Sequence, residues 1–219
     1  MWVRFLHAGP KLPMKLVAKP VQITIHHNWD KLLNSYDQIH LMWQQGRLKT
    51  KHYHDSYQTY FIDLGGIGSL QLLDNLCTDE KTASFLHGNL VETNLPWLSK
   101  LRKDFADLDI AAISLFSSCK DVLPHRDFEP DNQTQGHICK INYVIKTANA
   151  EIFVNGDQGT ESYSCLEGLA LLMDVEREHG LKSNGNQVYT FQISFHKHFE
   201  QVAEWFNQHS EFEYGQVEQ

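Results

Sequence analysis

The types and spacing of three residues give this chain its clearest chemical signal. His125-Arg126-Asp127 places an imidazole and a carboxylate two positions apart, and His179 supplies a second imidazole further along the chain. In a strand, alternate side chains share a face, so His125 and Asp127 can point together while Arg126 points away. Two imidazoles and one carboxylate can hold one face of a metal ion and leave three coordination positions open. We therefore predict a metal site formed by His125, Asp127 and His179.

This ligand set is typical of mononuclear non-haem Fe(II) oxygenases, whose open positions receive the co-substrate and O₂. A His-x-Asp pattern alone is a weak signal, because chance matches are common. Here it lies between β-like runs, and an apolar run with Glu167-Gly168 ahead of it precedes His179. The alternative is that His125 and Asp127 form a local hydrogen-bonded turn while His179 is a surface residue, since Asp readily bonds nearby backbone in turns.

The elements that must position these residues are short strands in the second half of the chain. Alternating or β-branched runs predict strands at 110–116, 138–145, 151–154, 169–173 and 188–195. Asn155-Gly156-Asp157 and Asn184-Gly185-Asn186 are turn signals between them. Several short strands at this spacing indicate a sandwich or barrel.

Helical patterns flank this β-rich region. Apolar spacing behind Asn28 predicts a helix at about 29–45, and Pro96 can open a second helix that carries Trp97, Leu98, Leu101 and Phe105 on one side. The stretches 17–25 and 60–63 are expected to be strands, and 197–209 a closing helix.

Composition limits the classes of function. The chain has 219 residues, 42% of them apolar, which suits one sizeable core. A net charge of −8 disfavours nucleic acid and anionic membranes as partners. The sequence has no apolar run of membrane-spanning length and no signal-peptide pattern, and its four cysteines form no C-x-x-C pair. We expect a cytoplasmic protein with reduced thiols that acts on a small molecule or a peptide; the oligomeric state stays open.

Residues 123–195 resemble the 2-oxoglutarate/Fe(II)-dependent dioxygenases, in particular the aspartyl/asparaginyl β-hydroxylase-like group that includes proline cis-hydroxylases. The matching segments are 123–129, 140–145, 166–174, His179 and the strand that ends at Phe195. The resemblance implies a mainly β or α+β protein with a double-stranded β-helix core, also called a jelly roll and similar to cupins. It also implies that His125, Asp127 and His179 are iron ligands, with 2-oxoglutarate and O₂ as co-substrates.

On this basis residues 1–219 are expected to form a single domain. Residues 1–109 would supply N-terminal helices and strands that cover the barrel, 110–196 the β-helix core with the metal site, and 197–219 a C-terminal helix and tail.

The chain departs from the family at one position. An arginine usually follows the distal histidine by about ten residues and binds the far carboxylate of 2-oxoglutarate, but the segment 187–195 contains no Arg or Lys. A charge-assisted pair is the main anchor of such a carboxylate. Lys140 is the leading substitute, with Asn142 on the same strand face and Tyr189 as a hydroxyl donor; Lys182 and Arg177 are further candidates. The alternative for Lys140 is a solvated lysine on an edge strand.

The sequence therefore favours an Fe(II)- and 2-oxoglutarate-dependent hydroxylase of an amino-acid side chain, free or in a peptide. Arg126, pointing away from the metal, is a candidate substrate contact together with Glu129. Two alternatives remain open: a cupin-type metal enzyme that does not use 2-oxoglutarate, and a non-catalytic binding module on the same fold.

Overall fold

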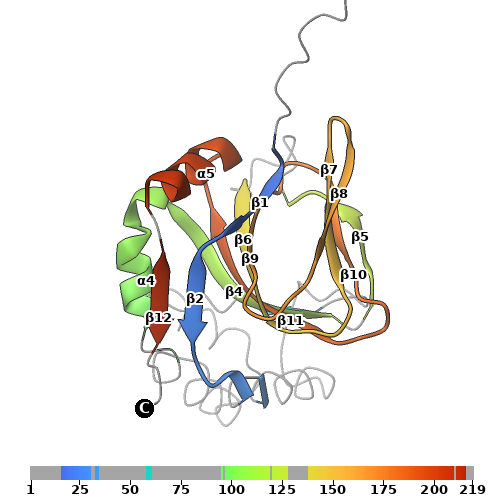
Figure 1. The fold of residues 1–219 in the computed structure, drawn as a ribbon, viewed down its shortest axis with the longest axis horizontal. Helices are drawn as coiled ribbons and strands as arrows, with labels where there is room; N and C mark the ends of the chain where they lie inside the picture. Colours follow the sequence, from blue (N-terminus) through green and yellow to red (C-terminus); the bar gives the residue numbers. More distant parts are fainter. Residues whose placement is uncertain are drawn as a thin grey trace, which may run out of the picture.

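A computed structural model of the chain describes residues 16–30, 33–34, 58–60, 95, 97–118, 120–127, 138–209 and 211–215. Two antiparallel sheets that face each other dominate the described part (Figure 1). The larger sheet has the strand order β1-β9-β6-β11-β4-β3. Its strands are β1 (Ala18–Val21), β3 (Gln58–Tyr60), β4 (Ile110–Ser118), β6 (Cys139–Lys146), β9 (Ala170–Asp174) and β11 (Val188–Phe195).

The smaller sheet has the order β5-β10-β7-β8. Its strands are β5 (Val122–His125), β7 (Glu151–Gly156), β8 (Gly159–Ser164) and β10 (His179–Lys182). A separate parallel pair joins β2 (Ile23–His26) to β12 (Phe212–Gly215). Because the chain crosses repeatedly between two facing antiparallel sheets, the core is a double-stranded β-helix, which confirms the predicted fold class.

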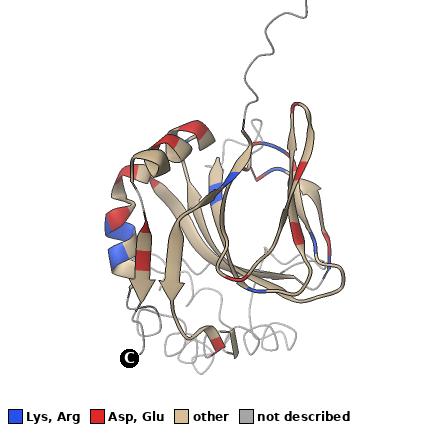
Figure 2. Ribbon diagram, viewed as in Figure 1, with Lys and Arg blue, Asp and Glu red and all other residues tan. Residues whose placement is uncertain are grey.

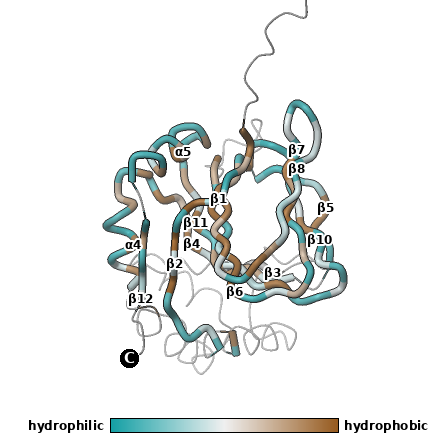
Figure 3. The backbone as a smooth tube through the Cα atoms, viewed as in Figure 1, coloured by the Kyte–Doolittle hydropathy of each residue, from teal (hydrophilic) through white to brown (hydrophobic). Residues whose placement is uncertain are grey.

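Strand alternation divides the apolar side chains into two layers. Tyr143, Phe191 and Ile193 belong to an outer cluster, where the larger sheet packs against helices and the β2–β12 pair. Val144, Val188 and Leu181 belong to an inner cluster between the two sheets. The hydropathy colouring in Figure 3 shows brown apolar segments along the strands and teal hydrophilic segments at several turns.

Two α-helices, α4 (Leu98–Asp104) and α5 (Phe199–Gln208), cover the outer face of the larger sheet in the described part of the chain. Leu98 and Leu101 of α4, and Val202 and Phe206 of α5, join the outer cluster. α5 begins with a capping box, in which the His198 side chain and the Gln201 side chain satisfy free backbone N–H groups. The charged residues of both helices lie along their exposed faces (Figure 2).

Most strands lie where alternation predicts them, and 188–195 matches β11 residue for residue. The stretch 17–25 divides into β1 and β2, and two strands from the first 109 residues, β1 and β3, pair within the larger sheet. Of the predicted helix at 29–45, residues 29–30 and 33–34 are helical and the remainder lies outside the described residues. Of the predicted strand at 60–63, only Tyr60 is described; it ends β3.

Four short strands, β5, β8, β10 and β12, are too short for a clear pattern of their own and are found only in the structure. The Asn184-Gly185 turn signal is confirmed, since both residues adopt positive φ between β10 and β11. Among the described residues, no helix is long and apolar enough to cross a membrane. The described cysteines, Cys139 and Cys165, are both free thiols buried in the core.

Candidate metal centre

Pairing between β5 and β10 brings the two predicted histidine ligands together. His125 ends β5 and His179 begins β10, and the two residues are direct partners in the antiparallel register. Their ring centroids lie 4.4 Å apart. The sequence did not indicate a strand at His179; the strand is short and relies on pairing with β5 and β7 on either side. His125 and His179, which are far apart in the sequence, therefore lie opposite each other on two paired strands.

Asp127 completes the cluster from the segment that follows β5. Its Oδ1 atom lies 3.4 Å from Nε2 of His125 and 3.6 Å from Nε2 of His179. The three ligand atoms lie within 4.8 Å of one another, and the trio is the only such group of His, Cys, Asp or Glu among the described residues. The backbone N–H of Asp127 donates to the Val175 carbonyl at 3.2 Å, which fixes this segment against the turn before β10.

Both imidazoles are oriented by backbone carbonyls two residues earlier. Nδ1 of His125 lies 2.9 Å from the Leu123 carbonyl oxygen, and Nδ1 of His179 lies 3.1 Å from that of Arg177. A carbonyl oxygen can only accept, so Nδ1 of each ring carries a hydrogen and Nε2 is the ring nitrogen that faces Asp127. Metal-ligating histidines are typically held in this way by a partner on the other ring nitrogen.

The electrostatics favour the metal-ligand forms of Asp127 and His179, whereas His125 is shifted toward its protonated form. Burial alone would raise the pKa of Asp127, but Lys140 and the two imidazoles outweigh it and hold the pKa well below its usual range. Burial lowers the pKa of His179 to about 4, so this imidazole is neutral at pH 7. A hydrogen bond with Asp127 raises the pKa of His125, which is the most exposed of the three.

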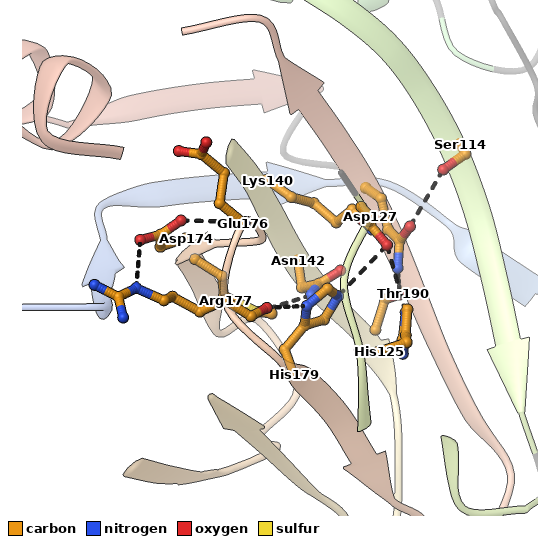
Figure 4. Close-up of polar contacts among 12 residues, drawn as sticks. Ser114, His125, Asp127, Lys140, Asn142, Asp174, Glu176, Arg177, His179 and Thr190 are labelled. Atoms are coloured by element: carbon orange, nitrogen blue, oxygen red, sulfur yellow. Dashed lines mark hydrogen bonds and ion pairs between the residues drawn. The ribbon is translucent and has the colours of Figure 1, made fainter. Parts of the chain in front are cut away.

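Lys140 lies beside the trio (Figure 4). Its ammonium forms an ion pair with Oδ2 of Asp127, and its side chain is 12% exposed. Because β6 is flanked by β9 and β11, Lys140 is on a central strand. This excludes the alternative of a solvated lysine on an edge strand. The two oxygens of the Asp127 carboxylate therefore have different partners: Oδ1 faces the histidines, and Oδ2 faces Lys140.

A row of buried polar side chains extends from Lys140 across the inner face of the larger sheet. Asn142, Gln192 and Ser114 are successive partners on β6, β11 and β4. Ser114 Oγ donates to Gln192 Oε1 at 3.4 Å, and Gln192 Nε2 donates to Thr190 Oγ1 at 3.3 Å. Asn142 Nδ2 donates to the Met173 sulfur at 3.0 Å.

Sequence reasoning missed Ser114, Thr190 and Gln192. Their signal is present in the sequence, because alternation along the predicted strand 188–195 puts Tyr189, Phe191, Ile193 and Phe195 on one face. Thr190 and Gln192 must therefore occupy the other face. Only the strand order could reveal that Ser114 is opposite Gln192.

The remaining predicted site residues are dispersed. Tyr189 packs against the outer cluster, on the face of β11 opposite Thr190, and so does not join Lys140 and Asn142. Arg126 is exposed. Lys182 lies over the Phe153 ring at 6.0 Å, and Arg177 pairs with Asp157 at 2.5 Å, so neither is placed beside the trio. Glu129 lies outside the described residues.

The trio fits a six-coordinate iron ion. Metal–nitrogen bonds of about 2.1 Å place neighbouring ligand atoms about 3 Å apart. Asp127 Oδ1 lies slightly farther than this from the two histidine Nε2 atoms, at 3.4 and 3.6 Å. The donors are two imidazoles and one carboxylate, the ligand set of non-haem Fe(II) sites. No fourth ligand from His, Cys, Asp or Glu joins the group in the described part of the chain, which leaves coordination positions for other molecules.

No sequence-family model matches the chain, and no curated protein matches it in sequence. Among solved structures, AviO1 from Streptomyces viridochromogenes is similar with a TM-score of 0.45 and 15% identity, over 82% of this chain and 89% of that one. A Pseudomonas putida prolyl-4-hydroxylase is similar with a TM-score of 0.45 and 12% identity, over 82% and 91% of the two chains.

The salicylate 1,2-dioxygenase of Pseudoaminobacter salicylatoxidans is similar with a TM-score of 0.41 and 9% identity, over 82% of this chain and 35% of that chain. Identities this low do not transfer function, so the function of this chain has to be inferred from its own site.

Proposed function

We propose that this protein is an Fe(II)- and 2-oxoglutarate-dependent oxygenase that hydroxylates an amino-acid side chain, free or within a peptide. The observation that carries the proposal is the convergence of His125, Asp127 and His179 beside Lys140, at one end of a double-stranded β-helix. The facial trio suits Fe(II), and the adjacent cation suits a co-substrate that bears carboxylates.

Each ligand of the trio has a distinct task. His125 and His179 present Nε2 in fixed orientations because their Nδ1 atoms are held by backbone carbonyls. Asp127 supplies the negative charge that partly balances Fe(II), and its Oδ1 faces both histidines. When bound, the iron would supply the oxidative chemistry of O₂ and 2-oxoglutarate, while the protein supplies geometry and substrate placement.

Lys140 is proposed to bind a carboxylate of 2-oxoglutarate. Its ammonium has three N–H donors, and the ion pair with Oδ2 of Asp127 does not occupy all three. Asn142, 6% exposed, lies on the same face of β6, and its Oδ1 has no partner among the described atoms. Thr190 has a hydroxyl on this inner face. We propose it as the hydroxyl contact to 2-oxoglutarate in place of Tyr189, which packs against the outer cluster.

Uncoupled turnover tests the proposal directly. Protein loaded with Fe(II) under anaerobic conditions should develop an Fe(II)–2-oxoglutarate absorption band when the co-substrate is added. On admission of O₂ it should slowly release succinate without any prime substrate. Neither signal in iron-loaded protein would contradict the proposal.

A cupin-type metal enzyme that does not use 2-oxoglutarate is the second candidate. Two observations favour it: Lys140 is already paired with Asp127, and β11 carries no arginine or lysine. Iron binding without an absorption band or succinate would support this candidate. Failure to bind any divalent metal would instead support a non-catalytic binding module.

A further inference from the structure

The turn between β9 and β10, residues 175–178, touches the metal trio through its backbone. The Val175 carbonyl accepts the N–H of Asp127 at 3.2 Å, and the Arg177 carbonyl accepts Nδ1–H of His179 at 3.1 Å. The N–H of Val175 donates at 3.3 Å to the carbonyl of Ile138, two residues before Lys140. One turn thus contacts the segments that carry Asp127, His179 and Lys140.

Asp174, the last residue of β9, contacts this turn through its side chain and its backbone. Asp174 Oδ1 accepts the N–H of Glu176 at 3.2 Å, and its own carbonyl accepts the N–H of Arg177 at 3.4 Å. Its Oδ2 lies 3.7 Å from Nε of Arg177, and Nη1 of Arg177 lies 2.5 Å from Oδ1 of Asp157. The Asp174 side chain is 6% exposed, whereas the Arg177 and Asp157 side chains are 30% and 62% exposed, so the contacts are buried at the Asp174 end (Figure 4).

We propose that Asp174 is a positioning residue for the metal centre. It acts by fixing the conformation of the β9–β10 turn. It touches none of the trio itself. Its carboxylate fixes the turn through a hydrogen bond to Glu176 and a charge contact with Arg177, and the turn then presents the carbonyls of Val175 and Arg177 to Asp127 and His179. Such outer contacts set ligand orientation and therefore metal affinity.

Two changes divide the contribution of Asp174. Asp174→Asn keeps an acceptor for the Glu176 N–H but loses the charge that faces Arg177. Asp174→Ala loses both contacts. Arg177→Met removes the charge contact from the other side and leaves the Arg177 carbonyl in the chain. Glu178→Gln is the matched control, because it removes one carboxylate from the same turn. The Glu178 side chain contacts Asn155 and not Asp174 or Arg177.

The inference rests on the proposed metal centre but not on 2-oxoglutarate, so Co(II) is a suitable probe. Affinity is measured by competition with a chelator, and the ligand-field absorption of bound Co(II) reports the geometry of the site. We expect Asp174→Ala to weaken Co(II) binding by about 10- to 100-fold and to change the absorption spectrum. Asp174→Asn and Arg177→Met should each have a smaller effect, and Glu178→Gln none.

The possible failures are distinguishable. If the unchanged protein does not bind Co(II), the proposed metal function is wrong. If the unchanged protein binds Co(II), and Asp174→Ala, Asp174→Asn and Arg177→Met all keep its affinity and spectrum, then Asp174 does not position the site. Should Asp174→Ala fail to fold, Asp174→Asn and Arg177→Met decide the matter, and wild-type affinity and spectrum in both would overturn the inference. A fall in melting temperature with an unchanged Co(II) spectrum would assign Asp174 a structural role only.

Discussion

At the scale of single residues, the chemistry depends on how one carboxylate is shared. Asp127 directs Oδ1 to the two histidines and Oδ2 to Lys140. The sequence predicted the trio because its residue types and the His-x-Asp spacing carry their own signal. It could not predict the ion pair with Lys140, since that contact depends on how β6 lies against the segment after β5.

Replacing Asp127 with alanine should abolish metal binding. The change removes the only anionic ligand of the trio, so we expect Fe(II) or Co(II) affinity to fall by more than about 100-fold. Equilibrium dialysis with metal analysis measures the effect. Retention of stoichiometric metal by Asp127→Ala would mean that the ion is held elsewhere.

Replacing Lys140 should separate the co-substrate from the metal. In Lys140→Met the alkyl stem is kept and the charge is lost, so the concentration of 2-oxoglutarate needed for half-maximal succinate release should rise by about 10- to 100-fold. Metal binding should survive. Lys182→Met is the control, because Lys182 is exposed and lies against Phe153. An unchanged response to 2-oxoglutarate in Lys140→Met would exclude Lys140 as the anchor.

At the scale of elements, the pairing of β5 with β10 determines whether the trio exists at all. Gly180 follows His179, and a Cβ added there would lie 2.5 Å from both the Phe153 ring and the Val122 carbonyl oxygen of β5. The close approach of β5 to β10 therefore requires glycine at this position.

Gly180→Ala should consequently loosen the metal centre as well as the fold. The added methyl group forces β5 or the Phe153 ring to move, at a cost of about 1–3 kcal/mol in the free energy of unfolding. Because Val122 and His125 belong to the same strand, Co(II) affinity should fall too. Gly156→Ala is the matched control, since its nearest neighbours would lie 3.5 Å away. Equal melting temperatures and affinities for the two variants would argue against this role of Gly180.

The predictability of each element follows from the strength of its local pattern. β11 was predicted in full because apolar and polar residues alternate along its whole length. β10 was missed because its four residues, His-Gly-Leu-Lys, are too few to show an alternating pattern. They form a strand because β5 and β7 pair with them on both sides. Tyr189 was assigned to the site by its distance from His179 along the chain, whereas its face on β11 directs it to the outer cluster.

At the scale of the whole molecule, a metal that binds only the folded chain must stabilise it. At a free metal concentration of about 100 times the dissociation constant, the gain is about 2.7 kcal/mol. The melting temperature should therefore rise on addition of Co(II) and fall again with a chelator, and Asp127→Ala should show no such shift. A similar rise in Asp127→Ala would indicate binding at another place.

The parallel pair β2–β12 has a consequence for how the chain acquires its structure. His26 and Glu213 form a 2.7 Å contact across 187 positions of sequence, and Tyr214, beside them, is 1% exposed in the outer cluster. During synthesis β2 cannot pair until residues 212–215 have left the ribosome, and such distant pairings are slow to form. A nascent chain stopped before residue 212 would hold every ligand of the trio and still have an open outer layer, exposed to other chains and to proteases.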